Sequence, residues 1–141
     1  MALDDILDPW MGEDKNLAKH SKTVRANVWR MEKALRRAGL SPCNGEVILD
    51  AGASKGTWQR GIAPTITASR AAGGFWSSRR NRLLQVQECM RLQGVLDSDF
   101  PMWEQVISYR QMGHITGNAM SVCVLARIMQ NVLVALGLPV K

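Results

Sequence analysis

The sequence predicts an α+β fold, in which the short strands of a basic central segment are flanked by helices. Apolar residues recur at helical spacing toward both ends of the chain, in residues 16–38 and 119–136. Between them, residues 52–81 are rich in Gly, Ala, Ser and Thr, a composition typical of short strands and irregular loops. With 141 residues the chain is long enough for one domain with a modest core.

The predicted elements follow one another in a simple order. After an irregular lead-in of about ten residues, a helix over residues 16–38 ends at Gly39, behind two arginines that suit the negative end of the helix dipole. A turn over residues 41–45 precedes a short apolar strand at residues 47–49. Three further helices are expected over residues 85–93, 102–112 and 119–136, each followed by a glycine. This order divides the chain into residues 1–46, 47–82 and 83–141.

The last predicted helix is apolar around most of its circumference, so it must be buried nearly all round. Arg127, Gln130 and Asn131 in its middle make it too polar for a membrane span. We therefore expect it to need a larger partner surface than this short chain supplies.

The net charge of +6 is concentrated in one segment. No Asp or Glu occurs between Ala51 and Gln87, whereas the same window holds six cations: Lys55, Arg60, Arg70, Arg79, Arg80 and Arg82. Outside this window the remaining twelve basic residues balance twelve acidic ones. Cations that contact phosphates release condensed counterions, and a merely solvated surface usually mixes both signs. The segment therefore favours nucleic acid as a partner.

The cysteines and histidines indicate neither a disulfide framework nor a metal site. Cys43, Cys89 and Cys123 are odd in number and widely spaced, which favours free thiols in a reducing compartment. Acidic residues at the start of the chain argue against a secretory signal, so we expect an intracellular protein, nuclear in a eukaryote or cytoplasmic in a bacterium. His20 and His114 stand alone, and no Cys/His cluster has zinc spacing.

Two local patterns suggest enzymes, and neither is followed by what its chemistry needs. Residues 47–56 resemble the strand and glycine loop of class I S-adenosylmethionine-dependent methyltransferases, but no acidic residue follows until Glu88. Pro42-Cys43 resembles the Pro-Cys nucleophile of cytosine-C5 methyltransferases, but Cys43 lies in a turn without a cationic neighbour to activate its thiol. We therefore expect no catalytic residue in this chain.

Three stretches, taken in order, resemble cytosine-C5 DNA methyltransferases. Residues 82–94, RLLQVQECMRLQG, resemble conserved element IX, typically written R-L-[TS]-x-x-E-x-x-R-L-Q-G, with one more residue before the glutamate than this pattern has. Residues 111–122, QMGHITGNAMSV, resemble element X, whose core is Q-x-G-N-[AS]-[VM]-S-x, but with a longer gap between Gln111 and the Gly117-Asn118 pair. Upstream, residues 48–54, 63–70 and 73–76 resemble the end of the target-recognition region. Because the order and the gaps are also family-like, the resemblance extends over residues 47–136.

The resemblance implies double-stranded DNA as a partner and S-adenosylmethionine as the cofactor. Extruding a target base costs a few kcal/mol, so the protein must grip the DNA on both sides. By resemblance, backbone contacts would come from Thr65, Thr67, Ser69 and Arg70, and the recognition loop would be shaped by Gly73 and Gly74. Charge adds Arg79, Arg80 and Arg82 as phosphate contacts. Asn118, Ala119 and Met120 would approach the methionine end of the cofactor, with the Asn118 amide at the start of a helix where a carboxylate is welcome.

Several family elements are absent from the 141 residues: the Phe-Gly cofactor loop, the Pro-Cys nucleophile loop, the Glu-Asn-Val acid element and the Gln-x-Arg-x-Arg element. Without a nucleophile and an acid we expect no methyl transfer by this chain alone. A subunit of a split enzyme, a truncated gene and a partial gene model all fit. The last helix would then pack on a class I methyltransferase sheet from a catalytic N-terminal half or subunit.

Two alternatives remain open from the sequence. The first is a stand-alone basic module that binds DNA or RNA without enzymatic activity. The second is a small class I methyltransferase that uses residues 50–56 as its cofactor loop.

Overall fold

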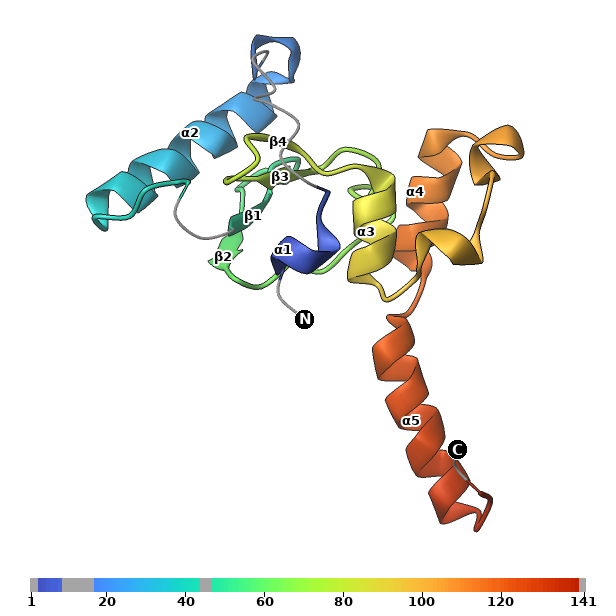
Figure 1. Ribbon diagram of the computed structural model, residues 1–141. Helices are drawn as coiled ribbons and strands as arrows, with labels where there is room; N and C mark the ends of the chain where they lie inside the picture. Colours follow the sequence, from blue (N-terminus) through green and yellow to red (C-terminus); the bar gives the residue numbers. More distant parts are fainter. Residues whose placement is uncertain (1–2, 9–16, 44–46, 140–141) are drawn as a thin grey trace.

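The computed structural model describes residues 3–8, 17–43 and 47–139, in which helices flank one small sheet (Figure 1). The helices are α1 (Leu3–Ile6), α2 (Lys22–Arg37), α3 (Val86–Leu92), α4 (Tyr109–Asn118) and α5 (Val122–Ala135). The strands are β1 (Val47–Asp50), β2 (Trp58–Arg60), β3 (Phe75–Ser77) and β4 (Arg82–Leu83). Short 3-10 turns lie at η1 (Leu17–Lys19), η2 (Asp97–Asp99) and η3 (Trp103–Gln105). The predicted α+β class is confirmed, whereas the division into residues 1–46, 47–82 and 83–141 stays a prediction.

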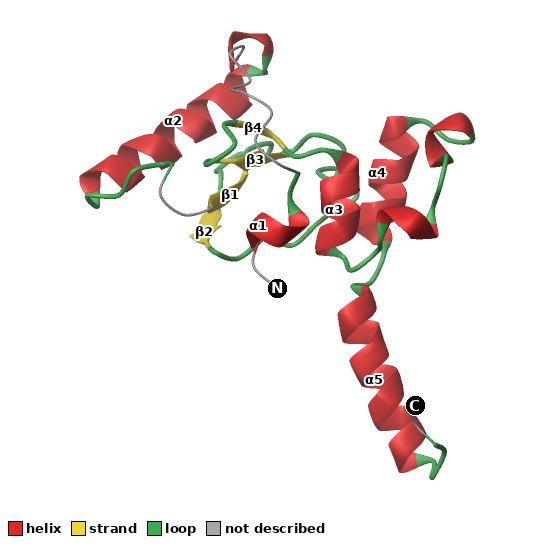
Figure 2. Cartoon of the chain, in the orientation of Figure 1, coloured by secondary structure: helices red, strands yellow, loops and turns green. Residues whose placement is uncertain are grey.

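The sheet has the order β2-β1-β3-β4, and the described pairings are all antiparallel. Because β1 is a central strand, its residues are buried on both faces, and successive side chains alternate between two cores. Val47 and Leu49 pack with α2, whereas Ile48 packs on the opposite face with Phe75. The sheet therefore lies between α2 on one side and α3 on the other (Figure 2).

Helix α2 holds the first turn of the sheet in place through a buried asparagine. Asn27 is 2% exposed, and its Nδ2 donates to the carbonyls of Ala51 and Ala53 at 2.9 and 2.7 Å. Its Oδ1 accepts the Gly56 N–H at 3.1 Å, and a Cβ at Gly56 would lie 2.8 Å from the Asn27 side chain. The loop at residues 50–56 is thus filled by α2 and joins two antiparallel strands. This geometry contradicts the idea that it is the cofactor loop of a small class I methyltransferase.

The start of the chain is anchored, which corrects the expectation of an irregular lead-in for residues 3–8. Leu7 is buried beside Ile48 and Phe75 in the second core. The guanidinium of Arg91 donates to the Ile6 carbonyl and to Asp8 Oδ1, both at 2.7 Å. Arginine side chains distant in sequence supply these anchors, so local pattern could not predict them.

Helix α4 begins later than the sequence predicted and runs through Gly113. Ser108 and Gln111 form a capping box, in which the Ser108 N–H donates to Gln111 Oε1 at 2.9 Å. The predicted helix over residues 102–112 is therefore wrong in its placement. Gly113 does not end a helix but lies in the middle of α4. A glycine is needed there because Ala72 approaches the helix closely at this position.

Helix α5 matches the predicted apolar last helix, and it projects away from the rest of the molecule (Figure 1). All residues of α5 are described, and none of them is buried. Its exposed large apolar side chains have between 44% and 66% of their surface accessible to solvent. The chain exposes 9134 Å², whereas a compact protein of its mass exposes about 7200 Å². Helix α5 thus leaves an apolar face without a covering surface.

By length and composition alone, Tyr109–Ala135 could cross a membrane, and the apolar window in it is not buried. This stretch contains both α4 and α5, and the chain leaves helical geometry at Ala119 between them. In α4, Met112, Gly113 and Thr116 are buried against the body of the protein. Only α5 is therefore available as a free apolar helix.

Candidate nucleic-acid and cofactor interface

The predicted recognition residues and the predicted cofactor residues meet where α4 lies on the turn formed by residues 67–74. Gly113 and Gly117 are one helical turn apart and face this segment. A Cβ at Gly113 would lie 2.5 Å from the Cβ of Ala72, and one at Gly117 would lie 2.1 Å from the backbone nitrogen of Ala68. No side chain fits at such separations, so the α4 backbone rests directly on the backbone of the turn.

The turn itself is compact and is tied to the end of β1. The Ala71 N–H donates to the Thr67 carbonyl at 3.0 Å, and the Gly74 N–H donates to the Arg70 carbonyl at 2.7 Å. The Gly74 carbonyl accepts the N–H groups of Ala51 and Gly52 at 2.8 and 3.1 Å. Gly73 has φ +107°, which favours glycine. Residues 67–74 therefore form a compact, hydrogen-bonded turn, which we call the platform, and not an extended loop.

The hydroxyl residues predicted to contact DNA line the outside of this platform. Thr65, Thr67 and Ser69 are exposed, whereas Arg70 is half-buried. The Arg70 side chain lies across Gly52 and Gly74 and forms an ion pair with Asp50, with Nε 3.2 Å from Oδ1. A carboxylate that precedes the acid-free window by one residue thus folds back to neutralise one of its cations.

Two more predicted phosphate contacts point inward. Arg80 is 5% exposed, and its Nε donates to the Asp8 carbonyl at 2.8 Å. Arg82 forms a two-pronged ion pair with Glu88, at 2.7 and 2.8 Å. Both arginines therefore hold the fold together, and their additional contact with phosphate stays a prediction. Arg79, by contrast, is exposed.

Glu88 is the centre of a buried ionic cluster that contains Arg82 and Gln85, which also belong to element IX. Its carboxylate accepts from Arg82, from the Gln85 N–H at 2.8 Å and from the Asp8 N–H at 3.0 Å. Burial would raise the pKa of this fully buried carboxyl, but the hydrogen bonds from Arg82, Gln85 and Asp8 outweigh burial and hold the pKa below 4.5. The cluster joins β4, the start of α3 and the N-terminal segment.

The residues predicted to approach the cofactor are exposed, but the prediction that Asn118 lies at the start of a helix is wrong. Asn118, Ala119 and Met120 are exposed at the end of α4. Asn118 is thus the last residue of a helix and not the first, so the helix dipole there does not favour a carboxylate. The next helix starts at Val122, and the Val122 N–H already donates to the Gln93 carbonyl at 2.8 Å.

A pocket of about 450 Å³ lies between residues 63–66, which precede the platform, and the ends of α3 and α4. It joins Thr65, from the predicted DNA contacts, to Ala119, from the predicted cofactor contacts. The Gln93 side chain, the glutamine of element IX, donates to the Ala119 carbonyl at 3.5 Å beside it. The full lining is Ala63, Pro64, Thr65, Ile66, Leu92, Gln93, Gly117, Ala119 and Ser121. Elements IX and X and the recognition segment therefore share one pocket.

Our sequence analysis did not identify Gly113 and Gly117, the two glycines at which α4 contacts residues 67–74. A Gly-x-x-x-Gly spacing on a helix indicates close backbone packing, and residues 113–117 have it.

In the described parts of the chain, 3–8, 17–43 and 47–139, no group of three or more His, Cys, Asp or Glu side chains could hold a metal ion.

The three cysteines differ in burial, which gives a first prediction. Burial, with a smaller contribution from the Glu88 charge, raises the pKa of Cys89 to about 12. Cys43 and Cys123 are exposed. Because the thiolate is the nucleophile, iodoacetamide at pH 8 is expected to modify two cysteines in the folded chain and three after unfolding, as counted by mass spectrometry. Modification of Cys89 at the rate of Cys43 under native conditions would contradict its burial.

Fold and site together define an α+β domain, in which residues 63–66, the end of α3 and the end of α4 surround one pocket. A comparison with protein families agrees, because the family model for C-5 cytosine-specific DNA methylase matches residues 7–133. The chain belongs to that family, and the predicted resemblance is confirmed. Comparisons with curated proteins and with solved structures find no match.

Proposed function

We propose that this chain is the DNA-recognising, C-terminal part of a DNA (cytosine-5-)-methyltransferase, inactive until a catalytic part covers α5. The observation that carries the proposal is the contact of α4 with the recognition platform through Gly113 and Gly117. This contact fixes the position of the predicted DNA contacts relative to element X. A recognition segment and a cofactor wall need such a fixed relation when a base is swung into a catalytic site.

In this proposal the outer side of the platform contacts the DNA backbone. Thr65, Thr67 and Ser69 offer exposed hydroxyls for phosphates, and Lys55, Arg60 and Arg79 are exposed cations of the same basic segment. Arg80 and Arg82 act mainly through the fold, since their guanidinium groups donate to Asp8 and Glu88.

The residues at the end of α4 fit one end of S-adenosylmethionine. The exposed Asn118 amide offers donors, and Ala119 and Met120 offer an accessible backbone beside the pocket. None of the pocket residues is acidic, so the group that holds the ribose hydroxyls would come from the catalytic part. The cofactor supplies the methyl group once that part is present.

The face of α5 supports a protein partner over a membrane. Arg127, Gln130 and Asn131 lie at i, i+3 and i+4 and share one polar strip, while the apolar side chains occupy the rest of the helix. Fourteen residues make a helix of about 21 Å, which is shorter than the roughly 30 Å hydrocarbon core of a bilayer. An intracellular location, in the nucleus or a bacterial cytoplasm, is part of the same proposal.

The test is reconstitution with a catalytic part of a family member that carries the Phe-Gly, Pro-Cys and Glu-Asn-Val elements. The full chain is expected to form a complex with it on size exclusion and to transfer labelled methyl groups to cytosine in duplex DNA. Neither partner is expected to do so alone. Ile128→Asp places a charge in the middle of the apolar face and is expected to abolish the complex, because an unpaired charge would be buried there.

Gln130→Asp on the polar strip is the matched control, and it should assemble and methylate like the unchanged chain. A folded monomer that ignores the catalytic part, or an Ile128→Asp variant that assembles normally, would overturn the proposal. The first of these outcomes would favour a stand-alone nucleic-acid-binding module, which the exposed cations of the chain also support.

A further inference from the structure

The outer face of α2 carries more exposed positive charge than the predicted recognition segment. Of the 16 residues of this helix, six are basic and one is acidic. The basic residues are Lys22, Arg25, Arg30, Lys33, Arg36 and Arg37, and all six are exposed. Glu32, the single carboxylate, already pairs with Arg36 at 3.3 Å. The excess charge on this face is therefore uncompensated by other residues of the helix.

This charge escaped the sequence argument because the chain outside residues 51–87 is neutral overall. The structure redistributes the charges: Arg70 pairs with Asp50, and Arg82 pairs with Glu88. Two carboxylates that lie next to the acid-free window thus neutralise cations inside it. The cations of α2 form a separate basic surface. We define this surface as the six exposed basic residues of the helix: Lys22, Arg25, Arg30, Lys33, Arg36 and Arg37.

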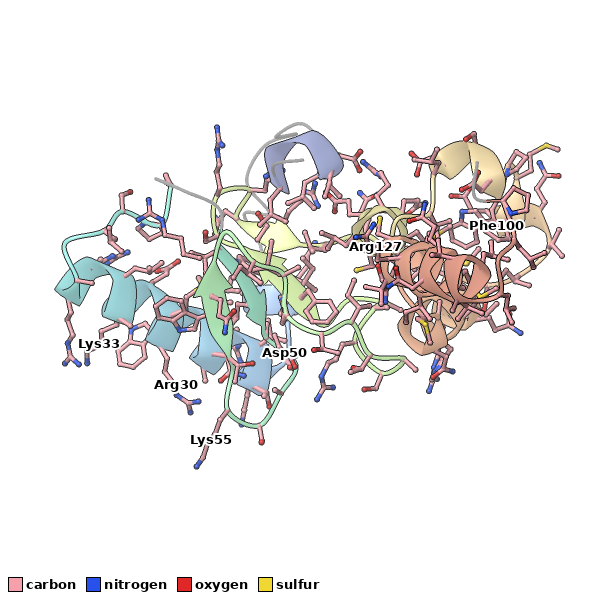
Figure 3. All side chains as sticks on the ribbon, turned by 90° about the horizontal axis from the view of Figure 1, so that it is seen from below. Arg30, Lys33, Asp50, Lys55, Phe100 and Arg127 are labelled. Carbon is pink, nitrogen blue, oxygen red and sulfur yellow. The ribbon has the colours of Figure 1, made fainter. Side chains whose placement is uncertain are left out.

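The face is built on a rigid support. Val24, Val28, Met31 and Leu35 are at most 7% exposed and pack α2 on the sheet. The turn that carries Lys55 is fastened to α2 because the Asn27 side chain donates to the Ala53 carbonyl. Arg30, Lys33 and Lys55 project toward the same side of the molecule (Figure 3).

We propose that the basic surface of α2 binds the phosphate backbone of duplex DNA, independently of sequence and separately from the recognition platform. The identity of the nucleic acid rests on the proposed function. A 16-residue helix is about 24 Å long, which corresponds to about seven base pairs of duplex. The basic side chains of α2 lie along one face of the helix, and such a row can contact the regularly spaced phosphates of a duplex.

Other anionic partners fit this surface less well. A bilayer requires an apolar helical face for insertion, and α2 uses that face against the sheet. Single-stranded nucleic acid is bound by successive aromatic platforms, and this helix offers one aromatic ring. That ring belongs to Trp29, which is 58% exposed and has the Lys33 ammonium 4.5 Å from its centre.

The test measures binding of the full chain to a labelled 20-base-pair duplex of arbitrary sequence at several salt concentrations. Lys33→Gln with Arg37→Gln is expected to weaken binding and to reduce the slope of log K against log salt by about 1.8, since each phosphate contact contributes about 0.9. The matched control, Arg110→Gln with Arg127→Gln, removes the same charge from exposed positions on α4 and α5 and should leave the slope unchanged. Far-UV circular dichroism confirms that each variant is folded.

Duplex binding that the Lys33/Arg37 variant retains with an unchanged slope would overturn this surface and leave the proposed function standing. Binding to anionic vesicles of phosphatidylserine and phosphatidylcholine, without binding to the duplex, would overturn it in favour of a membrane. Tighter binding to a single strand than to the duplex would also overturn it. Failure of the proposed function would appear separately, as the absence of methyl transfer in the reconstituted complex.

Discussion

Glu88→Gln is expected to destabilise the chain by about 3–5 kcal/mol, because it breaks the buried ion pair between Glu88 and Arg82. Glu88 is fully buried, and the Arg82 side chain is 13% exposed. The substitution also weakens the acceptors for the N–H groups of Gln85 and Asp8, so the start of α3 and the N-terminal segment lose an anchor together. Urea unfolding of the full chain, followed by far-UV circular dichroism, measures the loss.

The same variant changes the pH dependence of stability in a defined direction. The pKa of Glu88 in the folded chain lies below its ordinary value of 4.5, so the folded state holds the carboxylate more strongly than the unfolded state does. The stability that Glu88 contributes is therefore fully present above pH 4.5 and is lost as the pH falls through the lowered folded-state pKa. The difference in unfolding free energy between the unchanged chain and the glutamine variant should shrink on acidification below pH 4.5.

Glu104→Gln is the matched control, since Glu104 is an exposed carboxylate that accepts a hydrogen bond from Gln87. It should change the free energy of unfolding by less than about 0.5 kcal/mol. An effect of Glu88→Gln no larger than that of Glu104→Gln would show that the buried cluster does not stabilise the fold.

Sequence pattern predicted the elements whose cause is local. Helix α2 has the apolar spacing of Val24, Val28 and Leu35, and it ends within one residue of the predicted end but begins at Lys22, six residues later than predicted. Strand β1 is a short apolar run and lies where it was predicted. Helix α5 was predicted for the same reason, and its apolar composition also predicted that the chain alone would not cover it.

The candidate site depended on contacts between distant residues, and the sequence could supply only its parts. Arg80 and Arg82 were predicted to face phosphates because no acidic residue occurs near them between residues 51 and 87. In the fold, Arg82 pairs with Glu88, and Arg80 donates to the carbonyl of Asp8 in the N-terminal segment. Charge counted along a chain does not show which cations are paired in space, and this is why α2 was overlooked.

The position of α4 was mistaken for a related reason. A glycine commonly ends a helix, and Gly113 was treated as such an end. In the fold it allows two backbones to approach, and only the partner segment at Ala72 shows the need for it. The close approach of two backbones depends on the tertiary structure. Until the fold is known, a glycine such as Gly113 can therefore be interpreted either as the end of a helix or as a contact point within one.

Gly117→Ala is expected to separate α4 from the recognition platform and to lower methyl transfer by the reconstituted enzyme by about 100-fold. The new Cβ would lie 2.1 Å from the Ala68 nitrogen and 2.2 Å from the Thr67 carbonyl carbon. Both are backbone atoms that cannot rotate away, so the helix itself must move. A displacement of about 1 Å between a substrate-positioning segment and the chemistry can cost about 100-fold in rate.

The free energy of unfolding of the Gly117→Ala variant distinguishes a displacement of α4 from a simple change in helix propensity. Alanine is a better helix former than glycine by about 1 kcal/mol, so an unobstructed helix would gain stability from the substitution. Overpacking costs about 1–3 kcal/mol or more, so a net loss is expected in urea unfolding of the full chain. His114→Ala lies on the exposed side of the same helix and should leave both stability and methyl transfer nearly unchanged. If Gly117→Ala were as stable and as active as His114→Ala, α4 would not rest on the backbone of the platform, and the recognition segment would be positioned by other contacts.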